Sequence, residues 1–305
     1  MTFATHWHNL KTPDGRSLEV LTAGPDDGRC VLFHSGTPSA AIERPNVIEQ
    51  AAQRGLQFVT FSRPGYAGST QRPGRSVGDV ASDVTTILDA LGLDSFFCIG
   101  QSGGGPHALA CAALLPDRVL ATATLAGAAP WPADGIDWLE GMGPENLEEF
   151  HAGMQGAEAL TPFLEREAAH LQDVSSDDVV AAFGGLVSDV DKAALTGDHA
   201  ELQARSLRRA VSNGIAGWRD DDLAFVKPWG FDVASIRTPV AVWQGGEDRM
   251  VPLSHGVWLS SHIAGAEAHL IPSEGHLSLP INRLRDVLDG LLAMADTSPE
   301  AAAAS

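Results

Sequence analysis

Residues 95–104, Ser-Phe-Phe-Cys-Ile-Gly-Gln-Ser-Gly-Gly, are the stretch that decides the fold. The apolar run 95–100 predicts a buried strand, and the Ala- and Leu-rich segment 105–115 predicts a helix directly after it. Between them stands the pattern Gly-x-Ser-x-Gly, with Ser102 at its centre. A serine on so tight a strand-to-helix turn has its hydroxyl lifted into the open, where it can act as a nucleophile. A plain glycine-rich turn without chemistry is the alternative.

On both sides of this stretch the chain alternates short strand-like runs with helical patterns. This alternation is typical of an α/β fold, in which helices cover a parallel sheet. A continuous apolar run predicts a central strand, and period-two alternation predicts an outer one. Helices are expected near 46–54, after a cap at Ser76, and near 105–115 and 284–294. The predicted strands are 17–22, 30–34, 56–62, 95–100, 119–125, 239–244 and 268–271.

Residues 128–232 break the alternation, because they contain helical patterns and no convincing strand. We interpret this block as a helical lid inserted into an α/β core made of 1–127 and 233–295. The Ala-rich end, 296–305, is predicted to be a disordered tail. Within the lid, steps of 3, 4, 4 and 3 predict one continuous helix face through Ala204, Leu207, Val211, Ile215 and Trp218.

The composition narrows the classes of partner. The 305 residues include 20 Lys and Arg against 39 Asp and Glu, a formal net charge of −19. Because such a surface repels phosphate backbones and anionic lipids, we expect a small-molecule substrate, with no nucleic acid and no membrane partner; the oligomeric state stays unknown. No secretory pattern opens the chain and no apolar run reaches the roughly 18 residues of a membrane helix, so we expect a cytoplasmic protein. Cys98 and Cys111 lie in apolar runs and are predicted to be buried thiols.

A serine hydroxyl needs a base to take its proton. Of the 11 histidines, only His276 directly follows the last predicted strand, where a loop can bring an imidazole over Ser102. Asp248 ends the turn after strand 239–244, and its neighbour Glu247 is the rival acid. We prefer Asp248 because the acid normally stands at the far end of such a turn. The expected catalytic triad is therefore Ser102, Asp248 and His276, with the aspartate orienting the imidazole.

The oxyanion of an acyl transfer needs two backbone N–H donors. We expect one from Gly103, which follows the serine, and the second from Thr37, in the loop after strand 30–34. A purely structural loop is the alternative there. His34 is expected to orient this loop by hydrogen bonding.

The sequence predicts no metal and no cofactor. His6-Trp7-His8 is a lone pair of histidines near the start of the chain, without a third ligand close in sequence. The chain has no His-Glu-x-x-His, no paired Cys-x-x-Cys and no glycine-rich nucleotide loop.

Taken together, these segments resemble the α/β-hydrolase superfamily, specifically its lid-bearing α/β-hydrolase-1 group. The resemblance implies an eight-stranded, mostly parallel sheet, a helical lid between strands six and seven, and no cofactor. A serine nucleophile sets the chain apart from haloalkane dehalogenases and epoxide hydrolases, which use aspartate. Two departures are the extra residue in His34-Ser35-Gly36 and Ser62 where an aspartate is frequent. The resembling stretches are 34–38, 62–69, 100–104, 245–248 and 275–276.

An apolar lid over a serine predicts a carboxylic-ester hydrolase that forms an acyl-serine with a small to medium apolar ester. Trp131, just after strand 119–125, is expected to face the pocket. An aminopeptidase, a C–C bond hydrolase and a perhydrolase or haloperoxidase-like enzyme remain open on the same triad. A non-catalytic binding protein on this fold would be expected to have a broken triad. An aminopeptidase would need carboxylates in the lid to hold a free amine. The lid contains Glu148, Glu149, Glu165 and Glu167, but nothing in the sequence indicates that they point inward.

Overall fold

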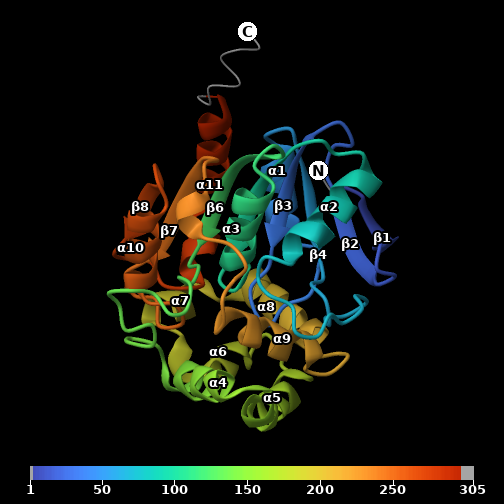
Figure 1. Cartoon of the computed structure of the whole chain (residues 1–305). Helices are drawn as coiled ribbons and strands as arrows, with labels where there is room; N and C mark the ends of the chain where they lie inside the picture. The colour runs from blue at the N-terminus through green and yellow to red at the C-terminus, as the bar shows by residue number, and fades with distance from the viewer. Residues whose placement is uncertain (1–2, 297–305) are drawn as a thin grey trace.

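The computed structural model describes residues 3–296, and an eight-stranded sheet runs through its middle (Figure 1). The strand order is β1-β2-β4-β3-β5-β6-β7-β8, and only the pairs that include β2 are antiparallel. The expected α/β class with a mostly parallel eight-stranded sheet is confirmed. The strands are β1 (Thr5–Lys11), β2 (Ser17–Ala23), β3 (Arg29–His34), β4 (Leu56–Phe61), β5 (Phe96–Gln101), β6 (Val119–Leu125), β7 (Val240–Gly245) and β8 (Glu267–Ile271).

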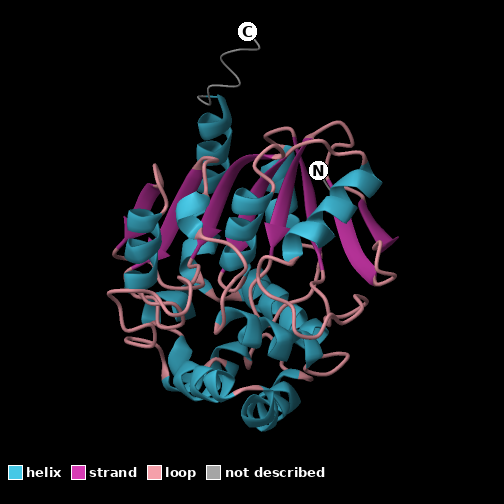
Figure 2. Ribbon diagram, in the orientation of Figure 1, coloured by secondary structure: helices cyan, strands magenta, loops and turns pink. Residues whose placement is uncertain are grey.

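Helices cover both faces of the sheet (Figure 2). α1 (Pro45–Ala52) and α11 (Ser278–Asp296) pack their apolar side chains on one face. α2 (Val80–Leu91), α3 (Gly104–Leu114) and α10 (Leu253–His262) pack on the other. Because the central strands are buried on both sides, their sequences are nearly continuous apolar runs rather than alternating ones.

The segment between β6 and β7, which we call the helical insertion, forms helices and no strand. It lies beyond the carboxyl ends of the parallel strands, toward which the arrows point in Figure 1. Loops that follow parallel strands meet at this edge, so the insertion is placed to cover whatever those loops carry. Its helices are α4 (Pro144–Gln155), α5 (Ala157–Leu171), α6 (Val179–Ala182), the 3₁₀ turn Gly184–Leu186, α7 (Asp189–Ala194), α8 (Gly197–Ala210) and α9 (Ala216–Phe225), and a second 3₁₀ turn, Val233–Ser235, leads into β7.

Two helix predictions need correction. The continuous face from Ala204 to Trp218 is divided, because α8 ends at Ala210 and α9 begins at Ala216, with Gly214 at φ +88° between them. Ser76 does not cap α2, which begins four residues later. The backbone N–H of Ser76 instead donates to the carboxylate of Asp79 at 2.7 Å, which closes a turn before the helix.

Residues Thr5–Lys11 form a strand that was not predicted from the sequence. His6, Trp7 and His8 belong to β1, an edge strand that pairs antiparallel with β2. Nε2 of His8 is 3.0 Å from the hydroxyl of Thr22, so this histidine belongs to the sheet pairing. At the other end, α11 includes Asp296, and the remainder of the predicted tail lies outside the described residues. Across 3–296, no helix is long and apolar enough to cross a bilayer.

Candidate active site

Ser102 stands on a sharp turn between β5, which ends at Gln101, and α3, which begins at Gly104. Its φ is +54°, a left-handed conformation that costs a non-glycine residue about 1–3 kcal/mol. Its backbone N–H donates to the carbonyl of Leu125 at 2.8 Å, which holds the turn in place. A Cβ at Gly100 would lie 2.3 Å from the carbonyl oxygen of Gly104, so this close approach of strand and helix requires glycine.

Asp248 and His276 meet in a buried hydrogen bond. Nδ1 of His276 lies 2.8 Å from Oδ2 and 3.0 Å from Oδ1 of Asp248. The same carboxylate accepts the backbone N–H groups of Met250 and Val251 at 2.8 Å each, and the side-chain amide of Gln244 at 3.0 Å. These bonds fix the orientation of the carboxylate and, through it, the orientation of the ring.

The environment of His276 favours a charged ring. Burial lowers the pKa of His276, but the facing carboxylate of Asp248 and the nearby charge of Asp191 outweigh burial and raise the pKa above its usual value. Glu247, the rival acid, is exposed to solvent, and its backbone N–H bonds to the carbonyl of Glu274. The structure therefore brings Asp248, and not Glu247, to the imidazole.

A second carboxylate holds the loop that carries His276, and the sequence analysis missed it. Asp191, in α7 of the helical insertion, accepts the backbone N–H groups of His276 at 3.1 Å, Leu277 at 2.8 Å and Ser278 at 2.9 Å. These are the donors at the start of α11, which would otherwise lack partners. A Cβ at Gly275 would lie 2.5 Å from the Asp191 oxygens, so the fit depends on glycine.

The loop after β3 comes close to Ser102. A Cβ at Gly36 would lie 3.2 Å from Cβ of Ser102, and a Cβ at Gly103 would lie 2.4 Å from the hydroxyl of Thr37. Arg63 donates to the carbonyl of Gly36 at 2.7 Å and to the hydroxyl of Thr37 at 2.9 Å. In a trans peptide the C=O and N–H point in opposite directions, so the N–H of Thr37 is turned away from Arg63.

Asp221 of α9 ties the helical insertion to this loop. Its carboxylate pairs with Arg63 and Arg75 at 2.6 Å each and accepts the hydroxyls of Tyr66 at 2.9 Å and Thr37 at 2.8 Å. All of these side chains except that of Thr37 are almost fully buried. Burial raises the pKa of Asp221, but the two guanidinium groups hold it well below its ordinary value. Such a buried network of ion pairs and hydrogen bonds fixes the position of the Thr37 loop.

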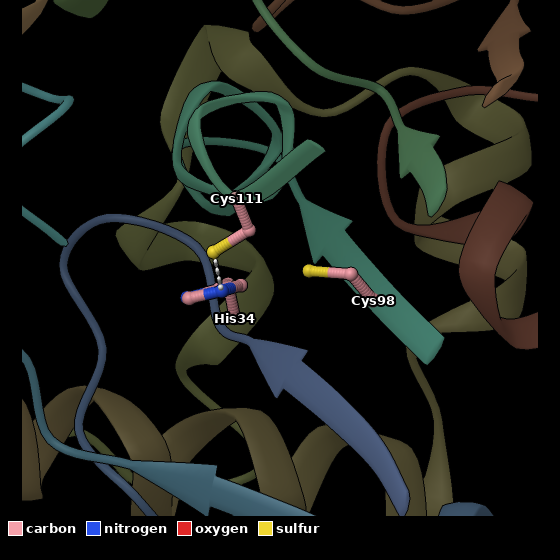
Figure 3. Close-up of side chains that lie close together, drawn as sticks. All are labelled: His34, Cys98 and Cys111. Atoms are coloured by element: carbon pink, nitrogen blue, oxygen red, sulfur yellow. Dashed lines mark hydrogen bonds between the residues drawn. The ribbon is translucent and has the colours of Figure 1, made fainter. Parts of the chain in front are cut away.

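We expected His34 to orient the Thr37 loop by hydrogen bonding. Among the described residues, it makes no hydrogen bond to that loop. Its Nε2 lies 3.6 Å from Sγ of Cys111, and its Nδ1 has no partner. Figure 3 shows His34 and Cys111 pointing toward one another, with Cys98 beside them. These are the donor types of a zinc site, and their three ligand atoms lie within 4.8 Å of one another. Burial raises the pKa of the Cys98 thiol well above its usual value, which opposes the thiolate that a metal requires. Burial also raises the pKa of Cys111, but its hydrogen bonds with Cys98 and His34 outweigh burial and lower it to about 6, so only one of the two thiols favours a thiolate.

A cavity of about 960 Å³, counted out to its opening to solvent, lies between Ser102 and the helical insertion. Thr37 and Gly103 line it together with Ser102. Ser102 and His276 both line a smaller neighbouring cavity of about 440 Å³. Ser102 therefore lines one cavity with Thr37 and Gly103 and the other with His276. The aromatic side chains on the wall of the larger cavity are Trp138, Phe150, Phe163, Phe183, Trp218 and Phe225.

Trp131, which was expected at the pocket, lines neither of these cavities. It is partly buried against the core cluster on the α2 and α3 face of the sheet. Trp138, seven residues later, takes a place on the cavity wall, and its indole N–H donates to the carbonyl of Ala129 at 2.9 Å.

Several acidic side chains of the helical insertion also reach the cavity. The sequence alone does not indicate whether Glu148, Glu149, Glu165 and Glu167 point toward the pocket. The structure leaves Glu148 and Glu165 exposed and turns Glu149 and Glu167 inward. The acidic residues that line the cavity are Glu145, Glu149, Glu167 and Asp222.

Comparison with known proteins fits this geometry. Residues 30–282 match the family model described as alpha/beta hydrolase fold. A non-heme chloroperoxidase from Streptomyces lividans is 27% identical over 269 residues, which cover 87% of this chain and 91% of that protein. A 2-hydroxy-6-oxononadienedioate/2-hydroxy-6-oxononatrienedioate hydrolase from Klebsiella pneumoniae is 22% identical over 275 residues, 86% of each chain. The esterase RhEst1 from Rhodococcus sp. ECU1013 superimposes with a TM-score of 0.64 at 17% identity, over 93% of this chain and 99% of that one.

Proposed function

Because the chain belongs to the alpha/beta hydrolase fold family, we propose that it is a serine hydrolase that cleaves carboxylic esters through an acyl-serine intermediate. The observation that carries the proposal is the buried bond between Asp248 and Nδ1 of His276, together with a serine on a strained turn that lines the same cavity as His276. With Nδ1 engaged by the carboxylate, Nε2 is the ring nitrogen left to take the proton of the Ser102 hydroxyl.

In the first half of the reaction, Oγ of Ser102 attacks the ester carbonyl carbon while its proton moves to Nε2 of His276. The carbonyl oxygen becomes an oxyanion, which we assign to the backbone N–H groups of Gly103 and Thr37. Collapse of the tetrahedral intermediate breaks the bond to the alcohol oxygen, and that oxygen takes the proton from His276. The acyl group stays on Ser102.

In the second half, water gives a proton to Nε2 of His276 and its oxygen attacks the acyl carbon. The second tetrahedral intermediate expels Oγ of Ser102, which recovers the proton from the imidazole. This step releases the carboxylic acid and regenerates the hydroxyl of Ser102. Throughout, the charge of Asp248 stabilises the imidazolium that forms twice in each cycle.

The acidic lining of the larger cavity does not suit the substrates for which the Klebsiella pneumoniae enzyme is named. That enzyme is named for dienedioate and trienedioate substrates, which carry two carboxylates. Here, among the described residues that line the larger cavity, four are acidic and none is Lys, Arg or His. Such a lining repels a dianion, so we assign the cavity to an ester without negative charge.

The test is labelling with a fluorophosphonate, which reacts only with an activated serine, followed by an assay of p-nitrophenyl butanoate hydrolysis. We expect wild-type protein to be labelled on Ser102 and to turn the ester over, and Ser102→Ala to do neither. Labelling or full turnover in Ser102→Ala would contradict the assignment, since removal of a triad member typically lowers the rate by several orders of magnitude.

A further inference from the structure

Two acidic side chains face each other on the wall of the cavity above Ser102. Glu149 comes from α4 and Asp222 from α9, and both line the cavity. Asp222 is only 1% exposed. The indole N–H of Trp218 donates to Oε1 of Glu149 at 2.6 Å, which fixes that carboxyl, and the two carboxyl groups lie close enough to shift each other's pKa.

Two buried carboxyl groups that lie close together oppose each other's ionisation. When both groups are ionised they only accept, and Oδ2 of Asp222 then has no donor. Burial, followed by the neighbouring charge of Glu149, raises the pKa of Asp222 well above its usual value, and burial raises the pKa of Glu149 to about 6. With a pKa of about 6, Glu149 still carries negative charge at neutral pH, whereas the raised pKa of Asp222 favours its protonated form.

Among the residues that the structure describes, that negative charge has no counter-ion of its own. Glu167 of α5 and Asp221 add further negative charge from the sides. Arg75 is the cation that acts on Asp222, but its guanidinium is already paired with Asp221 at 2.6 Å. Within residues 3–296, no basic side chain lines the cavity. A buried carboxylate without a cation is costly, so the site is built for a positive charge that arrives with the ligand.

We propose that the Glu149–Asp222 pair binds a protonated amine on the substrate, so that this hydrolase prefers esters or amides that carry an ammonium group over neutral ones of the same shape. The inference rests on the proposed acyl-serine chemistry and names its substrate class. On binding, the ammonium donates to both carboxylates, and a proton carried by Asp222 leaves to solvent. Trp218 also lines the cavity, where an aromatic ring can attract the same cation.

The experiment compares p-nitrophenyl 3-aminopropanoate with p-nitrophenyl butanoate, which differ by an ammonium in place of a methyl group. The quantity measured is the ratio of their kcat/KM values, each divided by the rate of spontaneous hydrolysis, for wild type, Glu149→Gln and Asp222→Asn. Glu148→Gln, a neighbouring acid exposed to solvent, is the matched control. Because the ratio is taken within one protein, a general loss of activity cancels.

We expect a ratio above one in wild type and in Glu148→Gln, and a ratio at least tenfold lower in Glu149→Gln and in Asp222→Asn. A ratio below one in wild type, or the same ratio in all four proteins, overturns the inference. If the butanoate is hydrolysed and Ser102 is labelled, that result leaves the serine chemistry standing. If wild type hydrolyses neither ester and is not labelled, the proposed function itself fails.

Should the two variants not fold, wild-type protein still gives an answer. Butylammonium and 1-butanol have similar shapes and differ in charge, and both can compete with p-nitrophenyl butanoate. We expect butylammonium to inhibit at a concentration at least tenfold lower than 1-butanol. Equal or weaker inhibition by butylammonium contradicts a site for positive charge.

Discussion

The carboxylate of Asp191 accepts the backbone N–H of His276 at 3.1 Å, although 85 positions of sequence separate the two residues. Asp191 lies in α7 of the helical insertion, and His276 follows β8 in the core. The insertion therefore does more than cover the cavity, because one of its helices holds the loop that carries the proposed base.

We expect Asp191→Asn to lower kcat by about 10- to 100-fold with little change in KM, because a small displacement of a catalytic group costs rate rather than binding. It should also move the acid limb of the pH profile to lower pH, since the charge of Asp191 raises the pKa of His276. Steady-state kinetics between pH 5 and 9 measure both effects. Asp189→Asn, on the same helix with a side chain 95% exposed, is the control and should behave as wild type.

Asp248→Asn should reduce kcat for p-nitrophenyl butanoate by about 10⁴-fold, because the amide no longer stabilises the imidazolium and favours the wrong tautomer. Glu247→Gln changes an exposed neighbour and should leave the rate within about twofold of wild type. If Glu247→Gln is the more damaging change, the acid has been assigned to the wrong residue.

The pH dependence follows from the raised pKa of His276. Only the neutral imidazole accepts the serine proton, so kcat/KM must rise with pH as His276 loses its proton. Because the pKa is raised, the midpoint should lie above 6.5, the ordinary value for histidine. A profile with its midpoint below 6.5 would contradict the effect of the two flanking carboxylates. The same shift stabilises the fold at low pH, and that contribution is lost as the pH rises through the folded-state pKa.

Asp221→Ala should destabilise the protein by about 3–5 kcal/mol, because Arg63 and Arg75 would stay buried with their common partner removed. Urea unfolding followed by tryptophan fluorescence measures this change in the free energy of unfolding. The contrast is Asp289→Ala, which breaks a surface pair with Arg54 and should cost less than about 1 kcal/mol. Similar losses in both variants would mean that the buried network contributes no more than a surface pair.

The core of the fold could be predicted because its signals are local. A buried strand such as β5 is a continuous apolar run, and the Ser102 turn has glycines at the two positions where strand and helix approach each other. β1 was missed because it is an edge strand whose side chains are largely exposed, so no apolar pattern marks it. The division of α8 from α9 depends on the backbone conformation of Gly214, which a hydrophobic period does not report.

The supporting residues of the site could not be predicted, because their partners are far away in sequence. Ser188-x-x-Asp191 is recognisable as a helix-capping pattern, but nothing in it points to His276. Asp221 and Asp222 are neighbours in an acidic run, yet one neutralises two arginines while the other faces the cavity. Only the way α9 packs against the core separates these two roles.

The Asp221 network has a practical consequence for anyone who exchanges segments between homologous enzymes. Its acid lies in the helical insertion, whereas both of its guanidinium groups belong to loops of the core. A hybrid that receives a foreign insertion without an equivalent acid inherits two buried cations with nothing to neutralise them, beside the loop of Thr37. A foreign insertion placed on this core must therefore keep α9 of this chain, and the insertion of this chain, moved to another core, needs Arg63 and Arg75 to go with it.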